Sequence, residues 1–166
     1  MKRILIVILT LSLVALSAKG QTVERFEIGS HYSLVHTNNY GLMGIVKANA
    51  DVHLTPNWAL GVDYGEGFSA INTYNQFRLV GGNVAYYLLM NNNSTLTIGI
   101  VTKVGGGLLW DRQADGSDLR KAFFSFGGGP RIYKNHFFIG TSIFGIYTND
   151  LRLFGFCNGI TAGLTF

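Results

Sequence analysis

Apolar and polar side chains alternate along most of the chain, the pattern of a β-strand that separates two environments. We count eight such segments, at residues 24–37, 43–54, 58–66, 75–89, 95–110, 119–133, 137–148 and 152–166. Each covers, or nearly covers, the roughly 9 to 11 residues that a tilted strand needs to cross a membrane. Beyond the N-terminal region no stretch keeps helical spacing for several turns. The pattern therefore predicts an all-β protein.

The two faces are clearest in segment 95–110. One face carries Leu96, Ile98, Ile100, Val104, Leu108 and Trp110, and the other carries Thr97, Gly99, Lys103, Gly105 and Gly107. We assign the apolar face to lipid and the polar face to the inside of a closed barrel. Arg78 and Asn158 fall on the lipid side, which we expect only near the outer interface or at a bulge. Pro130 is a further strain, because a barrel has no free edge to hold it.

The connections between the segments alternate in kind. Tight turns are expected at residues 55–57, 91–93 and 135–136, and longer connections at 38–42, 67–74 and 113–118, with a short one at 149–150. Short inner turns, longer outer loops and an even number of strands are typical of outer-membrane barrels. Aromatic residues gather near both ends of the segments, where amphipathic rings prefer to lie in a membrane.

The N-terminus has the three parts of a secretory signal peptide. Met1, Lys2 and Arg3 precede an apolar run from Ile4 to Leu16, and small residues follow. We place the cleavage after Gly20, with 15–17 as the alternative site. The apolar run is shorter than the roughly 20 residues of a spanning helix, which disfavours an uncleaved anchor. We therefore expect residues 1–20 to be the signal peptide and 21–166 to be one barrel domain.

Charge argues against nucleic acid as a partner. The 13 basic and 9 acidic residues of the full chain become ten and nine once Lys2, Arg3 and Lys19 leave with the signal peptide. A nearly neutral chain without a cluster of Lys and Arg lacks the electrostatic footprint of nucleic-acid binding. The single Cys157 cannot form an internal disulfide. Stability must come from the closed sheet.

The last fifteen residues, RLFGFCNGITAGLTF, alternate large apolar with small or polar residues and end on Phe166. With the alternating segments, this ending resembles the small eight-stranded outer-membrane barrels of the OmpA/OmpX type. The resemblance covers essentially the whole chain after the signal peptide. It implies a place in the outer membrane of a Gram-negative cell, contact with membrane lipid and lipopolysaccharide, and assembly by the barrel assembly machinery through the strand that ends at Phe166.

Eight strands leave an interior that side chains fill, so we expect a plugged polar lumen and no open pore. The polar face collects nine charged or titratable residues: Glu27, His31, Lys47, Asp51, His53, Asp63, Lys103, Lys121 and Arg131. Folding the first two segments about residues 38–42 sets Glu27 opposite His53 and Ser33 opposite Lys47. Such groups need partners where water is scarce. We interpret them as a network of ion pairs and hydrogen bonds.

His31 and Ser33 share one face of the first strand, and only Glu27 on that face could orient the histidine. The three residues are weak catalytic candidates, for a lipid-modifying enzyme of the lipid A acyl hydrolase type. In that family the His-x-Ser motif lies late in the barrel and faces lipid, whereas this pair lies early and points inward. We therefore expect no catalysis, and we keep the enzyme as the alternative.

No metal or cofactor is expected. The four histidines have no close metal-ligand spacing and no second cysteine accompanies them. The runs Gly105–Gly107 and Gly127–Gly129 lack the Gly-Lys-Ser/Thr that follows in a phosphate-binding loop. They are better explained as positions where a small barrel bends.

The longest outer connection, residues 65–75, carries two aromatic residues in a polar frame, Phe68 and Tyr74. Binding residues are often found on loops held by a rigid scaffold. We expect this loop and residues 113–118 to contact lipopolysaccharide or an extracellular partner. The sequence therefore favours a structural or adhesive barrel of the outer membrane. A secreted carrier of the lipocalin type, with its apolar face around a ligand, is the less favoured alternative.

Overall fold

The computed structural model describes residues 26–37, 41–69, 76–93, 96–112, 115–148 and 155–166. They form eight strands and no helix. The strands are β1 (Phe26–Thr37), β2 (Gly41–His53), β3 (Trp58–Ser69), β4 (Gln76–Asn93), β5 (Leu96–Arg112), β6 (Asp118–Lys134), β7 (Phe137–Thr148) and β8 (Gly155–Thr165). The predicted signal peptide, residues 1–20, lies outside the described residues. In the part of the chain that is described, no helix is long and apolar enough to cross a membrane.

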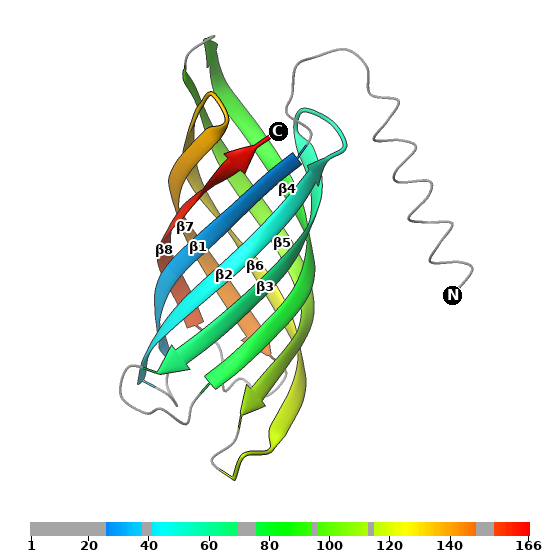
Figure 1. Cartoon of the computed structure of the whole chain (residues 1–166), viewed down its shortest axis with the longest axis vertical. Helices are drawn as coiled ribbons and strands as arrows, with labels where there is room; N and C mark the ends of the chain where they lie inside the picture. Colours follow the sequence, from blue (N-terminus) through cyan, green and yellow to red (C-terminus); the bar gives the residue numbers. More distant parts are fainter. Residues whose placement is uncertain (1–25, 38–40, 70–75, 94–95, 113–114, 149–154) are drawn as a thin grey trace, which may run out of the picture.

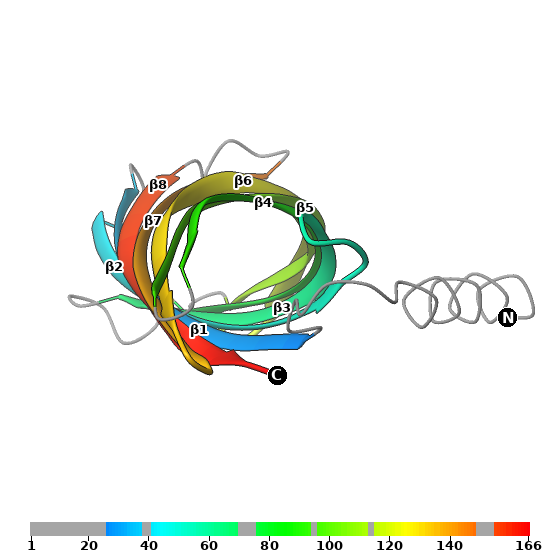
Figure 2. The same ribbon diagram turned by 90° about the horizontal axis from the view of Figure 1, so that it is seen from above.

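The strands pair in sequence order, each antiparallel to the next, and β8 returns to β1 to close the barrel. Figure 1 shows the strands tilted against the long axis, and Figure 2 shows the closed ring seen along that axis. Phe26 and Phe166 complete the closure, since each backbone N–H donates to the other's carbonyl oxygen, at 3.1 and 2.8 Å. The predicted eight-stranded antiparallel barrel is confirmed.

One end of the barrel carries both of its termini and the tight connections after β2, β4 and β6, and we call it the turn end. At the opposite, loop end lie the connections after β1, β3, β5 and β7. Thr55 shapes the turn after β2, because its Oγ1 accepts hydrogen bonds from the N–H of Asn57 and of Trp58, at 3.3 and 3.0 Å. Asn135 shapes the turn after β6 with a positive φ of 54°, which asparagine tolerates.

The hairpin ladders run further than the sequence suggests. Asn91, Asn92 and Asn93, expected to form a turn, pair with Ile98, Thr97 and Leu96 after a bulge in β4, and only residues 94–95 connect the strands. β3 continues to Ser69, so Phe68 lies on a strand and pairs with Gln76. Continued pairing provides hydrogen-bond partners for backbone N–H and C=O groups that would lack a partner within the chain in a wider loop.

The predicted register of the first hairpin is wrong by two residues. Glu27 lies opposite Asp51 and not, as predicted, opposite His53. Lys47 lies opposite His31 and not opposite Ser33. The ladder reaches Thr37 and Gly41, so the connection is shorter than residues 38–42. Loop length sets the register of a hairpin, and shortening the loop moves every opposed pair.

Successive side chains point to opposite faces, and the outer face is apolar. In β5, Leu96, Ile98, Ile100, Val104 and Leu108 are all exposed on the outside of the barrel, between 38% and 51%. The other strands add the same kind of residue, including Ile28, Val62, Val80, Val84, Phe126, Ile139 and Ile160. A barrel in water would cover or replace such a surface, whereas lipid accepts it.

Pro130 fits the barrel because one ladder gives way there. It pairs with Ile100 of β5, but the β6–β7 ladder stops at Gly128 and resumes at Arg131, so Gly129 and Pro130 are not part of it. Proline has no N–H to donate. The gap in the ladder falls at the residue that has no donor.

Candidate functional site

Among the described residues, the interior of the barrel holds four ion pairs, two between neighbouring strands and two between strands that are distant in the sequence. Lys47 Nζ lies 3.3 Å from Asp63 Oδ2, and Lys121 Nζ lies 3.2 Å from Asp111 Oδ2. Lys103 pairs with Asp51 and Arg131 pairs with Glu27. Each of the four buried acids therefore has one base, and these charges cancel within the lumen.

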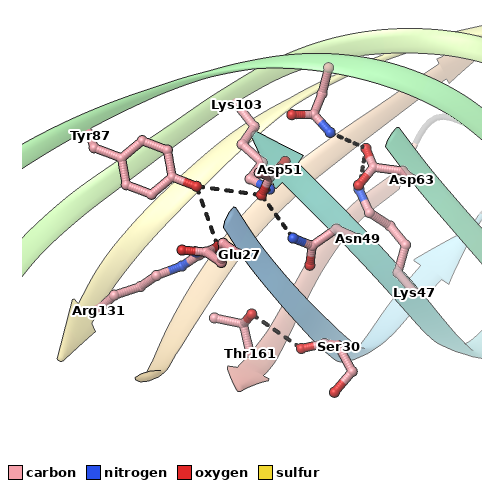
Figure 3. A network of polar contacts seen from close by, with 11 residues as sticks. Glu27, Ser30, Lys47, Asn49, Asp51, Asp63, Tyr87, Lys103, Arg131 and Thr161 are labelled. Atoms are coloured by element: carbon pink, nitrogen blue, oxygen red, sulfur yellow. Dashed lines mark hydrogen bonds and ion pairs between the residues drawn. The ribbon is translucent and has the colours of Figure 1, made fainter. Parts of the chain in front are cut away.

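The opposed carboxylates of Glu27 and Asp51 are the centre of the network (Figure 3). Two carboxylates on neighbouring strands repel each other, and both are fully buried. Arg131 compensates one and Lys103 the other. The hydroxyl of Tyr87 lies between them, 3.3 Å from Glu27 Oε1 and 3.4 Å from Asp51 Oδ2, where it can donate to either oxygen.

Asparagine amides extend this network towards the loop end. Asn49 Nδ2 donates to Asp51 Oδ2 at 2.8 Å, and Asn83 Nδ2 donates to Asp63 Oδ2 at 3.0 Å. All these residues lie on strands, whose pleat turns every second side chain inward. Figure 3 shows Tyr87, Lys103 and Arg131 reaching from β4, β5 and β6 toward Glu27 and Asp51 on β1 and β2.

Two apolar layers lie on either side of the polar network. At the loop end, eight buried side chains fill the lumen: Met43, Ile45, Phe77, Leu79, Leu109, Phe123, Phe144 and Ile146. At the turn end, Ala59, Ala85, Tyr87 and Val101 form a smaller cluster, against which Tyr133 packs. The Asp111–Lys121 pair lies beyond the larger layer, closer to the loops. In the described part of the chain, side chains occupy the lumen from the turn end to the loop end except for a cavity of about 50 Å³.

The structure places the nine predicted lumen residues on the inner face of the barrel. It also adds partners that the sequence did not predict, Asn83, Tyr87, Asp111 and Ser142, and it shows that the inward Asn49 donates to Asp51. The alternation along β5 could have predicted Asp111, because this residue lies two positions after Leu109 and therefore points inward as Leu109 does. Ser142 gave no such signal, because its contact with His31 depends on the closure of the barrel, which brings β7 within two strands of β1.

The weak catalytic candidates do not form a catalytic arrangement. His31 Nδ1 lies 3.0 Å from the Oγ of Ser142, on a different strand from Ser33. The Ser33 hydroxyl and His31 Nε2 are buried and have no hydrogen-bond partner in the described part of the chain. Glu27 binds Arg131 and Tyr87, not His31. His31 and Ser33 are 6% and 1% exposed, so a lipid acyl chain outside the barrel does not reach them.

A cavity of about 50 Å³ lies beside the network. Among its lining residues are His31, Asp63 and Asn83, each of which has a buried polar atom that no described residue hydrogen-bonds. A space of this size accommodates a few water molecules, which need several polar neighbours each. The cavity suits bound water and is too small for an organic ligand.

The binding candidates of the outer loops lie at the loop end. Phe68, 42% exposed, points outward near the end of β3, and Tyr74 lies outside the described residues. In the connection after β5, Asp115 Oδ1 accepts hydrogen bonds from the N–H and the hydroxyl of Ser117, at 2.9 and 2.6 Å. These bonds lower the pKa of the Asp115 carboxyl. Gly116 supplies the positive φ of 82° that this turn requires.

Metal ligands do not cluster anywhere that the structure describes: no three His, Cys, Asp or Glu side chains there are grouped to hold an ion. The carboxylates that could act as ligands are held by Lys or Arg instead.

Comparison of the sequence with protein-family models and with curated proteins finds no match. Solved structures do match. Neisserial surface protein A has a TM-score of 0.60 at 10% identity, over 85% of this chain and 96% of that one. The N-terminal β-barrel domain of Pseudomonas aeruginosa OprF has a TM-score of 0.59 at 15% identity, over 84% of this chain and 97% of that one. Ail, the attachment invasion locus protein of Yersinia pestis, has a TM-score of 0.48 at 13% identity, over 86% and 97%.

The similarity to the first two structures covers nearly all of those chains. The fold is that of the small eight-stranded outer-membrane barrels of the OmpA/OmpX kind.

Proposed function

We propose that the protein is exported, inserts into the outer membrane of a Gram-negative cell, and acts there as a structural or adhesive surface protein with a plugged lumen and no catalysis of its own. The observation that carries this proposal is the division of every described strand into an apolar outer face and an inner face that is charged or tightly packed. That division is the reverse of a soluble barrel, which keeps its apolar face inside.

The filled lumen argues against transport. The ion pairs neutralise one another, and the eight apolar side chains of the loop-end layer block the route between the polar centre and the loops. An ion on that route would lose its hydration without gaining ligands. The barrel is therefore a rigid scaffold, and what remains for function is its surface.

The loop end is the part of the scaffold that would face outward. Outer-membrane barrels keep both termini on the periplasmic side, which places residues 38–40, 70–75, 113–117 and 149–154 at the cell surface. Phe68 and Tyr74 are our candidates for contact with lipopolysaccharide or an extracellular partner. The similarity to a protein known as a Neisserial surface protein is consistent with such a role.

Assembly would proceed through the C-terminal strand. β8 carries the alternating pattern to the end of the chain, and Phe166 is 58% exposed at the turn end. An exposed aromatic residue next to the last strand suits recognition by the barrel assembly machinery. We propose that machinery as the partner during insertion.

The first experiment compares the migration of the protein, extracted from outer membranes in detergent, on gels with and without boiling. A closed barrel resists the detergent at room temperature, so we expect two bands that differ in mobility and merge after boiling. Recovery from the soluble periplasmic or secreted fraction, with no shift, would overturn the proposal and favour the carrier of the lipocalin type.

The second experiment tests the surface role. Residues 70–75 and 113–117 are replaced by short glycine-serine linkers, separately and together, and the heat shift of each variant verifies the barrel. We expect reduced attachment of whole cells to surfaces, or reduced resistance of the outer membrane to detergent. Unchanged attachment and unchanged resistance in the double variant would contradict the role of the loops.

The enzyme alternative makes an opposite prediction, which the same material tests. Ser33→Ala and His31→Ala would abolish a lipid A acyl hydrolase activity without affecting the barrel. Because both side chains are sealed in the lumen, we expect wild-type protein in lipid A vesicles to release no fatty acid. Release that disappears in Ser33→Ala would establish the enzyme instead.

A further inference from the structure

Arginine and tryptophan side chains form a row across the outer wall of the barrel near its loop end. Arg78 is the third residue of β4, Trp110 is the third from the end of β5, and Arg120 is the third residue of β6. Arg78 lies opposite Trp110, and Trp110 lies opposite Arg120. Neighbouring strands are about 4.8 Å apart, so the two arginines are separated by about 10 Å. We call these three residues the arginine row.

The arginine row lies at the edge of the apolar band. The next outward positions toward the turn end are Val80, Leu108 and Ala122, which oppose one another in the same two ladders and are exposed. Trp110 is half-buried, whereas Arg120 is exposed and the side chain of Arg78 is 66% exposed. Tryptophan prefers the depth at which hydrocarbon meets headgroups. The arginines beside it are therefore at the level of the headgroups.

Among the described residues, arginine on the outer face is found only at this end. Of the four arginines that the structure describes, Arg131 is in the lumen and the others, Arg78, Arg112 and Arg120, are exposed in the loop-end parts of β4, β5 and β6. At the turn end the outer face carries Trp58, Phe137 and Phe166. In the membrane location proposed above, this end would face the outer leaflet.

The geometry of arginine suits phosphate. Its planar guanidinium donates two parallel hydrogen bonds to one phosphate group, and it is less strongly hydrated than the ammonium of lysine. Glu66 competes for Arg78, with Oε1 at 3.4 Å from Nε, and Tyr64 OH donates to the same Oε1 at 2.6 Å. An ion pair this exposed is weak, and a phosphate can displace it.

From this placement we infer that the arginine row binds the phosphate groups of a phosphorylated glycolipid in the outer leaflet, with Arg78 and Arg120 on the phosphates and Trp110 against the sugar and acyl boundary. The inference rests on the outer-membrane location proposed above. It differs from the loop contact proposed there, because the site lies on the wall of the barrel. The lipid would hold β4, β5 and β6 together where they leave the membrane.

The test uses protein purified from outer membranes and reconstituted in phosphatidylcholine nanodiscs. Lipid A carrying two phosphates and the same lipid after enzymatic dephosphorylation are titrated, and bound lipid is counted by native mass spectrometry. We expect the phosphorylated form to bind about tenfold more tightly, the gain from charge-assisted hydrogen bonds at two arginines. Equal binding of the two lipids would overturn the inference.

The variants distinguish binding at the arginine row from a general effect of positive charge on the protein. Arg78→Gln with Arg120→Gln is expected to remove the tenfold preference, whereas Lys134→Gln, which removes an exposed base at the turn end, keeps it. The heat shift of each variant verifies the fold. A preference that survives in the double arginine variant overturns the inference. Failure of the wild type to enter the nanodiscs as a heat-shifting barrel would contradict the proposed membrane location instead.

Discussion

Two arginine–glutamate pairs among the described residues have the same chemistry in opposite environments. Arg131 and Glu27 lie in the lumen with side chains 7% and 0% exposed, whereas Arg78 and Glu66 lie on the outer wall with 66% and 51% exposed. Inside, each charge depends on the other, because water is scarce. Outside, water and lipid headgroups compete for both. Burial therefore makes the inner pair necessary for folding, whereas the exposed outer pair can exchange a partner for a ligand.

The largest effect is expected from breaking the inner pair. Arg131→Met leaves Glu27 buried opposite Asp51 with no compensating base, and we expect a loss of about 3–5 kcal/mol in the free energy of unfolding. Urea titration in detergent, followed by the gel shift of the unboiled protein, measures it. The Arg131 guanidinium also stacks 4.6 Å from the ring of Phe138, a contact that methionine partly replaces.

A second variant shows whether charge or packing causes that loss. Glu27→Gln combined with Arg131→Met removes the orphaned charge, and we expect it to recover more than half of the stability lost in the single variant. A double variant as unstable as Arg131→Met alone would show that the packing of Arg131, not its charge, is what the lumen needs.

The next largest effect tests the outer face. Val104, in the middle of β5 and 51% exposed, is expected to meet lipid at mid-depth, so Val104→Arg should cost about 2–4 kcal/mol in vesicles. Phe137→Arg, at the first residue of β7 on the turn-end rim, should cost about 0–1 kcal/mol. Equal costs at the two depths would contradict a lipid-facing band.

Two glycines compare the faces without any charge. A Cβ on Gly67 would lie 2.1 Å from a ring atom of the buried Phe77, whereas a Cβ on the outward Gly82 would have its nearest neighbour at 3.7 Å. Gly67→Ala should therefore cost about 1–3 kcal/mol through overpacking, and Gly82→Ala should be neutral or slightly stabilising. The same urea titration checks both, and a neutral Gly67→Ala would show that the loop-end apolar layer is loosely packed.

The sequence predicts the strand number and the faces well, because alternation is a local property of each strand. Sequence-based prediction is wrong about features that depend on the connections between strands. The observed register, which pairs Glu27 with Asp51, differs from the predicted one by two residues because the loop is shorter than its composition suggests. Asn91 is part of the β4–β5 ladder despite asparagine's preference for turns. Contacts between strands that are not paired, such as His31 on β1 with Ser142 on β7, depend on the curvature of the whole barrel, which no local pattern encodes.

The smallest effect on stability is expected at the outer pair. Glu66→Gln removes the competitor of Arg78, and the coupling between Glu66 and Arg78 in a double-mutant cycle should be about 0.2–1 kcal/mol, the range of exposed ion pairs. The same substitution should strengthen the binding of phosphorylated lipid A, because it frees the guanidinium for phosphate. A coupling as large as that of the inner pair would show that water does not reach the outer wall at this depth. Weaker lipid binding by Glu66→Gln would mean that Glu66 orients Arg78 toward the phosphate and does not compete with it.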